Sequence, residues 1–262
     1  MLVICNGTFK SGSSWIHAIV LEIFRIKDIN TDVIPINYNP DIKSPTRILE
    51  NNLPNFLKNE DFKKFNYITK AHYFSNKVMI EKYSTDVRFI FITRNVKDAI
   101  VSHFHHFNNY RNKGLGFNRY FKFIGVFKAY EICLCNSRYK NNFDSNLFFS
   151  FEMLKSDFID SVKKLCLILG VSEISTSEIL KIKENTSLSK MMTVALEGGN
   201  RYYPELGVES HKLFRKGNIG DWKQYFIDSD LKLINRVIQL DPPLYVVIGY
   251  FFIFTLRRKF GF

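Results

Sequence analysis

A short glycine-containing loop near the start of the chain carries residue types suited to an anionic nucleotide. Gly7 and Gly12 bracket four residues in the stretch GTFKSGSSW, which is the glycine spacing of a phosphate-binding loop. Such a turn between a strand and a helix directs backbone N–H groups at one point, and the helix N-terminus adds positive potential. Lys10 lies inside the loop, whereas Ser13 stands where a P-loop ATPase has its lysine. The loop therefore predicts a phosphate or sulfate site that differs from that of an ATPase.

A second cation follows a buried strand further along the chain. P-loop NTPases hold magnesium partly through an Asp at the end of another strand, but here the run RFIFIT is followed by Arg94. A cation at this place repels a metal ion and attracts an anionic group, so we expect chemistry without a metal. His103 and His106 would share a helix face, but no carboxylate or cysteine accompanies them, which favours a structural role.

The elements that must position these residues alternate in type. Apolar runs predict strands at 2–6, 66–70, 88–93 and 146–151, and helical periodicity predicts the intervening and following helices. The expected helices lie after the glycine loop and at 95–108, 118–138, 157–169 and 229–239. This alternation predicts an α/β fold with a central parallel sheet flanked by helices, similar to P-loop NTPases. Segment 37–61 and the stretch 193–220 are expected to be mainly loops.

The composition favours one globular domain. The 262 residues contain 46% hydrophobic residues, with no low-complexity tract or internal repeat, and we expect a domain over 1–241 followed by a tail at 242–262. The formal net charge of +12 predicts attraction to anions, but it does not choose among nucleic acid, a membrane surface and a phosphorylated ligand. The four cysteines form no CxxC pair and are interpreted as reduced core thiols, which indicates a cytoplasmic protein.

Four motifs, in this order along the chain, resemble the cytosolic-type sulfotransferases that use 3′-phosphoadenosine 5′-phosphosulfate (PAPS). FKSGSSW is similar to the family's 5′-phosphosulfate loop, and ITKAHYF to its Lys-x-His segment. TRNVKDAIVSHFHHF resembles the block in which an Arg and a Ser eight positions later bind the 3′-phosphate, and RKGNIGDW resembles the RKGxxGDW loop. The resemblance spans about residues 1–226. It implies sulfuryl transfer from PAPS to a hydroxyl or amine acceptor, with adenosine 3′,5′-bisphosphate (PAP) as the product and no metal.

The resemblance also implies a role for each matched residue. His72 is expected to be the general base, while Lys10 and Lys70 stabilise negative charge on the transferring group and the leaving oxygen. Trp15 is expected to stack on adenine. The expected donor-binding residues are Lys10, Ser11, Gly12, Ser13, Ser14, Trp15, Arg94, Ser102, Phe151, Thr186, Leu188, Arg215, Lys216 and Gly217.

Three departures from the family bear on adenine binding and on assembly. Phe151 stands where the family often has Tyr, and Leu188 stands where it has Phe, so adenine binding is expected to depend more on Trp15 and Thr186. The dimerisation motif of many animal members is not recognisable after the GDW sequence, and the sequence predicts no oligomeric state. The acceptor loops, expected near 37–65, 105–120 and 193–212, admit a small molecule, a lipid or a carbohydrate.

Two other classes of function share some features of the sequence. A small-molecule kinase would need a lysine after Gly12 and a metal-holding carboxylate, which the motifs lack. A non-catalytic nucleotide-binding or nucleic-acid-binding protein would suit the charge, but it gives no reason for Lys10, Lys70 and His72 to occur together, and no nucleic-acid recognition motif is present.

In the tail, the apolar run 244–256 precedes three basic residues and is too short to span a bilayer. It is interpreted as a packed terminal element or, alternatively, as a peripheral membrane contact through 244–259.

Overall fold

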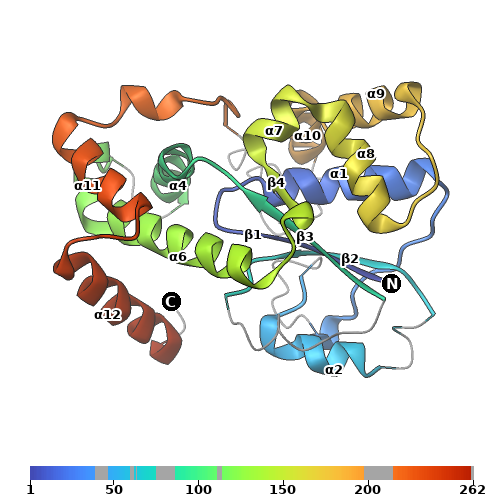
Figure 1. Cartoon of the computed structure of the whole chain (residues 1–262), viewed down its shortest axis with the longest axis horizontal. Helices are drawn as coiled ribbons and strands as arrows, with labels where there is room; N and C mark the ends of the chain where they lie inside the picture. The colour runs from blue at the N-terminus through green and yellow to red at the C-terminus, as the bar shows by residue number, and fades with distance from the viewer. Residues whose placement is uncertain are drawn as a thin grey trace. The chain divides into compact units, whose positions relative to one another are not determined.

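The computed structural model describes residues 1–38, 47–59, 62, 64–74, 86–110, 114–197 and 215–260. Its chain divides into two compact units (Figure 1). The first unit combines Met1–Thr93 with Asn142–Gly217, and the second combines Arg94–Asn141 with Asn218–Phe262. Each unit has its own buried core, described separately below.

A four-stranded parallel sheet forms the centre of the first unit. Its strands are β1 (Leu2–Gly7), β2 (Tyr67–Ala71), β3 (Val87–Thr93) and β4 (Phe148–Ser150), in the order β2-β1-β3-β4. Cys5 pairs with Lys70 on one side of β1 and with Ile90 on the other. Every residue of β1 is buried, as expected for a central strand with both faces covered. The predicted α/β class with a parallel sheet is confirmed.

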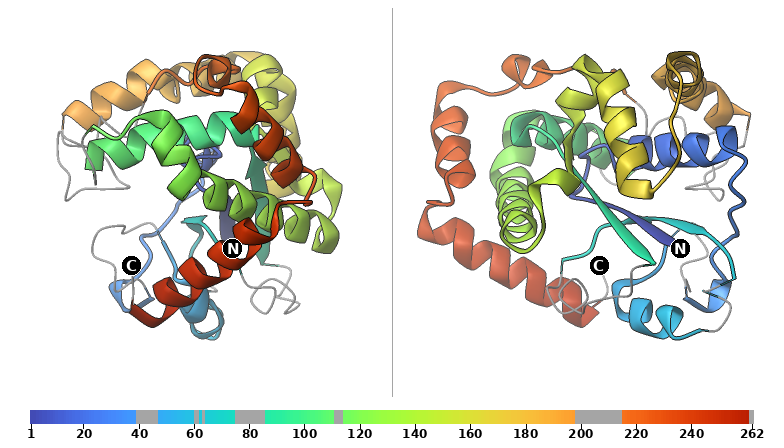
Figure 2. Two further views of the ribbon diagram at one scale, coloured as in Figure 1. Left: turned by 90° about the vertical axis from the view of Figure 1, so that its left-hand side faces the viewer. Right: turned by 45° about the vertical axis from the view of Figure 1, so that its right-hand side comes forward.

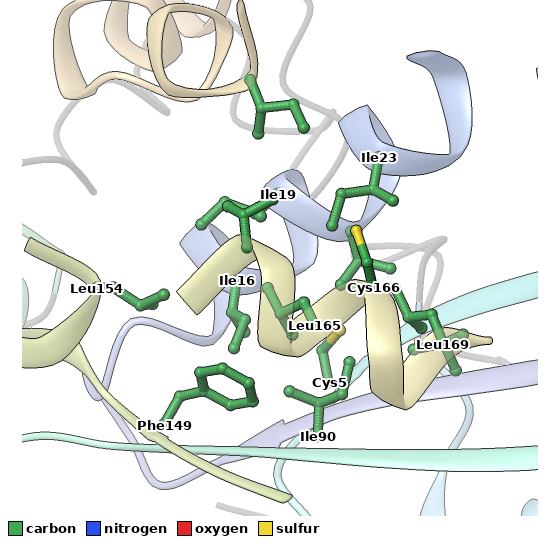
Figure 3. Packing of buried hydrophobic residues seen from close by; sticks show 14 of the residues in the cluster. Cys5, Ile16, Ile19, Ile23, Ile90, Phe149, Leu154, Leu165, Cys166 and Leu169 are labelled. Carbon is green, nitrogen blue, oxygen red and sulfur yellow. The ribbon is translucent and has the colours of Figure 1, made fainter. Parts of the chain in front are cut away.

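Helices α1 (Ser13–Ile26), α8 (Phe158–Leu169) and α9 (Thr176–Asn185) cover one face of this sheet. The apolar positions of α1 recur at helical spacing, so that Ile16, Ile19 and Ile23 all point into the core (Figure 3). They meet Leu165 and Leu169 of α8 above the strand residues. Helix α8 ends where the sequence predicted, and Gly170 caps it in the left-handed conformation (φ 66°).

The opposite face of the sheet carries mainly aromatic contacts. Helix α2 (Leu53–Leu57), which follows the 3-10 turns η1 (Ile36–Tyr38) and η2 (Glu50–Asn52), places Phe56 edge-on against Tyr67 of β2 with ring centroids 5.1 Å apart. Phe143 packs on Phe91 of β3 at 4.5 Å. Both faces of β1 are therefore covered within the first unit, and side chains that serve a ligand must lie at the strand ends.

The second unit is helical. It contains α4 (Val96–Tyr110), α5 (Phe117–Tyr120), the π-helical turn η4 (Phe121–Gly125), α6 (Val126–Asn142), the 3-10 turn η7 (Asp221–Gln224), α11 (Asp228–Ile238) and α12 (Leu244–Phe260). Figure 2 shows α12 beside α6, where Tyr250 packs edge-on against Tyr130 at 5.4 Å. Within the described ranges, no helix is both long enough and apolar enough for a membrane crossing.

Most predicted elements are confirmed, and two predictions are wrong. The strand expected at 146–151 is shorter, because the 3-10 turn η5 (Ser145–Leu147) precedes β4 and Phe151 already begins α7 (Phe151–Ser156). The Ser150 hydroxyl accepts a hydrogen bond from the Met153 N–H and thus starts that helix. Residues 193–196, expected in a loop, belong to α10 (Leu188–Leu196). All four cysteines are free and buried, as predicted.

Candidate active site

The four parallel strands end at one edge of the sheet, and the predicted residues follow these ends in the chain. The glycine loop follows β1, His72 follows β2, Arg94 follows β3 and Phe151 follows β4. The carboxyl edge of a parallel sheet is the usual ligand position in open α/β folds. Sequence motifs that are far apart in the chain thus begin at neighbouring strand ends of the same sheet.

The loop after β1 is held in a tight turn. Ser11 donates hydrogen bonds to the Thr8 carbonyl from both its backbone N–H (3.2 Å) and its hydroxyl (2.7 Å). Lys10 (φ 62°) and Gly12 (φ 102°) both adopt the left-handed conformation, which brings the chain into α1 at Ser13. The first N–H groups of a helix have no carbonyl partner within it, so the start of α1 is suited to anionic oxygens.

Lys70 lies beside the start of α1. It is on β2 opposite Cys5, is 2% exposed, and donates a hydrogen bond from Nζ to the Ser14 hydroxyl at 3.3 Å. Burial, with a smaller contribution from nearby Arg47, lowers the pKa of the Lys70 ammonium to about 7. An anion bound at the loop would favour the protonated form, so Lys70 is placed to respond to a ligand's charge.

His72 is fixed by the loop itself. Its Nδ1–H donates to the Gly7 carbonyl over 2.6 Å, since a carbonyl can only accept, and the Phe9 ring centroid lies 6.1 Å from the imidazole. In the neutral ring this hydrogen bond leaves Nε2 as the unprotonated nitrogen. A basic nitrogen held at the glycine loop is suited to take a proton from a group bound beside the loop.

Aromatic side chains from α1, α7 and α8 pack together next to the loop. Trp15 packs edge-on against Phe151 with centroids 5.3 Å apart, and lies nearly parallel to Phe158 at 6.3 Å. Leu188 opens α10, and Thr186 is 1% exposed at the end of α9, where its hydroxyl donates to the Ile182 carbonyl at 2.8 Å. Towards a ligand, this hydroxyl can then act only as an acceptor.

Gly217, one of the predicted 3′-phosphate residues, lies beside this aromatic group. It adopts φ 60°, and a Cβ there would lie 3.6 Å from Leu188 and 3.9 Å from Phe151. Its carbonyl accepts a hydrogen bond from Lys155 Nζ at 2.6 Å. The two preceding cations, Arg215 and Lys216, are half-buried and exposed respectively. Lys155 was not singled out from the sequence, where nothing distinguishes it from other surface lysines.

Within the second unit, the start of α4 is joined to the chain that follows Gly217. Arg94 Nη2 donates to the Asn218 carbonyl at 3.0 Å. Asp98 is 1% exposed and accepts from the N–H groups of Gly220 (2.8 Å) and Trp222 (3.1 Å). Ser102 lies one helical turn after Asp98 on the same side of α4. From the sequence, Asp98 was simply one residue of the helix expected at 95–108.

The neighbouring histidines of α4 make contacts with tyrosines of the same unit. His103 Nδ1 hydrogen-bonds the Tyr120 hydroxyl, and His105 Nε2 lies 2.9 Å from the Tyr225 hydroxyl. These contacts agree with the structural role predicted for this run. In the part of the chain that the structure describes, no group of three or more His, Cys, Asp and Glu residues is arranged to hold a metal ion.

Comparison with known proteins gives a consistent family match. A family model described as a sulfotransferase domain matches residues 2–246. The chain is 24% identical over 246 residues to a flavonol 3-sulfotransferase of Flaveria bidentis, covering 87% of this chain and 78% of that protein. It is 25% identical over 252 residues to cytosolic sulfotransferase 6 of Arabidopsis thaliana, covering 88% of this chain and 75% of the relative.

The fold also resembles solved structures. A mouse sulfotransferase complexed with PAP superimposes with a TM-score of 0.64 at 23% identity, covering 92% of this chain and 82% of the other. A retinol dehydratase in complex with androsterone and inactive cofactor PAP gives a TM-score of 0.59 at 18% identity, covering 92% and 80% respectively. At these identities the structural likeness concerns the fold.

Proposed function

The chain belongs to the sulfotransferase domain family, and we propose from this membership how its own residues perform PAPS-dependent sulfuryl transfer. When bound, PAPS supplies the sulfuryl group and PAP as the leaving group. The observation that carries the proposal is the arrangement at the end of β1, where the Gly7 carbonyl fixes His72 and the start of α1 lies beside buried Lys70. This arrangement combines a proton acceptor with cationic charge at one glycine loop.

The residues at the loop fit the 5′ end of such a donor. A Cβ at Gly7 would approach the Ser11 hydroxyl to 2.5 Å and Ile92 to 2.7 Å, so the turn requires a residue without a side chain. The conformation of this turn sets the direction of the N–H groups that precede α1. We propose that Lys10, Ser11, Gly12, Ser13 and Ser14 bind the 5′-phosphate and the sulfuryl oxygens.

The adenine and the 3′-phosphate would be bound by the remaining predicted residues. We propose that Trp15 stacks on the base, with Phe151 and Leu188 as apolar neighbours, and that the Thr186 hydroxyl accepts from the adenine amino group. This assignment agrees with the hydroxyl's own hydrogen bond to Ile182, which uses its proton. The 3′-phosphate would be bound by the cations and the hydroxyl of two motifs, namely Arg94, Ser102, Arg215, Lys216 and Gly217.

The proposed chemistry divides proton transfer and charge stabilisation between different residues. Nε2 of His72 takes the proton from the acceptor's oxygen or nitrogen, because Nδ1 already donates its proton to Gly7. Lys10 and Lys70 stabilise the negative charge that builds up on the leaving phosphate oxygen. This is the role that magnesium has in kinases, and the cation Arg94 follows β3 where those enzymes have a metal-holding carboxylate.

For the acceptor, we propose a small molecule, lipid or carbohydrate with a hydroxyl or amine group. The relatives named above include a flavonol sulfotransferase, which supports a hydroxyl acceptor. The acceptor loops predicted near 37–65, 105–120 and 193–212 lie partly outside the described residues, at 39–46, 111–113 and 198–214. We further propose that 1–241 works as one catalytic domain, because the family match extends across both compact units.

The similarity to cytosolic sulfotransferases supports a cytoplasmic location, and we propose in addition a peripheral membrane contact through 244–259. One side of α12 packs in the second unit through Val246 and Tyr250. The other side exposes five large apolar residues at helical spacing, namely Leu244, Tyr245, Ile248, Phe251 and Phe252. The sequence has three basic residues at the end of this helix, which suits anionic headgroups.

The decisive experiment is an acceptor screen with radiolabelled PAPS, accompanied by thermal shifts with PAP, ATP plus magnesium, and an oligonucleotide. We expect stabilisation by PAP and label transfer to at least one acceptor, unchanged by a chelator. Stabilisation by ATP only with magnesium would favour a kinase, and stabilisation by the oligonucleotide alone would favour a nucleic-acid-binding protein. Activity that is lost in chelator and restored by magnesium would refute the metal-independent mechanism.

A further inference from the structure

Asp98 is a buried carboxylate that none of the proposed roles uses. It lies in the first turn of α4, where the Asn95 side chain accepts from the Lys97 N–H at 3.0 Å and caps the helix. With 1% of its surface exposed, its charge must be compensated by groups of the protein. Its contacts therefore reveal what the charge is for.

Both carboxylate oxygens of Asp98 bind backbone N–H groups of one distant segment. Oδ2 accepts from Gly220 at 2.8 Å, and Oδ1 accepts from Trp222 at 3.1 Å, across 122 and 124 positions of sequence. Gly220 is held at φ 83°, so the segment passes through a turn that favours glycine. Charge-assisted hydrogen bonds of this length are stronger than neutral ones, and two of them fix both position and orientation.

Two further contacts tie the same segments together. Arg94 Nη2 holds the Asn218 carbonyl at 3.0 Å, and the Lys97 ammonium lies 4.4 Å from the centre of the Trp222 ring. Residues 218–222 are thus attached to 94–98 through four contacts in the second unit. The segment follows directly on Arg215, Lys216 and Gly217 in the chain. Arg94 and Ser102 flank Asp98 at four positions before and four positions after it.

We infer that Asp98 is a positioning residue for the 3′-phosphate site, and this inference rests on the proposed function. Asp98 does not bind the donor, because its two oxygens are occupied by Gly220 and Trp222. It holds residues 218–222 of the RKGNIGDW segment against the start of α4, directly after Arg215, Lys216 and Gly217 in the chain. A carboxylate is required because an amide would present an N–H group to one of these two donors.

The test compares Asp98→Asn with wild type in binding PAP and adenosine 5′-phosphate, measured by calorimetry. We expect the preference for PAP to fall by about tenfold or more, as it should in Arg94→Ala, while affinity for adenosine 5′-phosphate stays within about threefold. The matched control is Asp230→Asn, which alters another buried carboxylate of the second unit and should leave the preference unchanged. With labelled PAPS, KM should rise more than kcat falls.

The outcomes separate the inference from the proposed function. A wild-type protein that does not prefer PAP would refute the 3′-phosphate site itself. A wild-type preference that survives in Asp98→Asn, or equal losses for both ligands, would overturn the inference alone. Hydrogen exchange on the wild-type protein supplies a measurement that needs no variant. The amides of Gly220 and Trp222 should be protected, and rapid exchange of both would also overturn it.

Discussion

His72 and Lys70 are held in different ways, and each way has its own consequence. His72 is oriented by a backbone carbonyl of the glycine loop, whereas Lys70 is enclosed in the sheet and hydrogen-bonded to Ser14. The first arrangement selects the nitrogen that is able to accept a proton. The second makes the ammonium sensitive to the charge of a neighbouring ligand. We therefore expect changes at the two residues to give different signatures.

Replacing His72 with Ala should reduce turnover by about 10²–10⁴ while leaving PAP affinity unchanged. The loss should be larger for an aliphatic alcohol than for a phenol, because a partly ionised phenol depends less on a base. Initial rates with labelled PAPS and both acceptor types measure this difference. Turnover of the alcohol within a few-fold of wild type would show that His72 is not the base.

PAP binding should depend on pH through Lys70. Its pKa is lowered to about 7 by burial, so at higher pH the uncharged amine predominates in the ligand-free protein. An anionic ligand favours the ammonium, so binding takes up a proton and affinity falls as pH rises from about 7 to about 9. The phosphates of PAP are largely ionised throughout this range, since their second pKa is near 6.

Calorimetry in two buffers of different ionisation enthalpy measures this proton uptake. Lys70→Met should abolish it, whereas the exposed Lys216→Met should weaken binding but retain the uptake. Equal uptake in wild type and Lys70→Met would assign the titration to another group.

The turn between β1 and α1 depends on contacts that are too close for any side chain at Gly7. Ile92 of β3 contributes both its side chain and its carbonyl, at 2.7 and 2.8 Å from the position of a Cβ. Since β3 is fixed by its pairing with β1 and β4, Ile92 cannot move away from Gly7 without disturbing the sheet. The geometry of the loop is therefore coupled to strand packing.

Gly7→Ala should lower the free energy of unfolding by about 1–3 kcal/mol through this overpacking, and should weaken PAP binding. Denaturation in urea with and without PAP gives both quantities. Gly116→Ala is the matched control, since among the described residues no atom beyond its two chain neighbours lies within 4 Å of its Cβ position, and its φ of −70° suits alanine. Its effect on stability should be about 1 kcal/mol or less. Equal effects of the two substitutions would contradict the role given to Gly7.

For the chain taken as a whole, the positive charge and the exposed apolar side of α12 both favour the peripheral membrane contact proposed above. The formal net charge is +12, and α12 has no acidic residue. Phe252 and Ile248 on the exposed side are 65% and 59% exposed, while Val246 on the other side is fully buried. A helix that is packed along one side is suited to lie on a membrane surface rather than to enter it.

Full-length protein should float with vesicles that contain phosphatidylserine, and should float less as salt is raised. Replacing Ile248 and Phe252 together with Ser should abolish this flotation. Leu167→Ser removes an apolar side chain on α8 that is even more exposed, and should have no effect. Wild-type protein that ignores these vesicles, or an identical result for both variants, would refute the membrane contact.

The sequence by itself determined the order of the strands, the glycine loop and most of the helices, and it supplied the candidate residues of the site. These features are local, because strand and helix periodicities and short motifs lie within a few residues of one another. It missed α9, although Ser175 and Glu178 form a capping box, and it extended a strand through Phe151, where the Ser150 cap starts a helix. In both places a local signal was present in the sequence.

Only the tertiary structure decided which nitrogen of His72 is basic, what Asp98 holds and which side of α12 remains exposed. The Asp98 contacts join residues more than 120 positions apart, and the hydrogen bond from His72 to Gly7 spans 65 positions. No spacing in the sequence encodes such pairs, because they form only when the sheet and the helices pack together. The sequence thus supplied the chemical groups, and the packing determined their orientation and their partners.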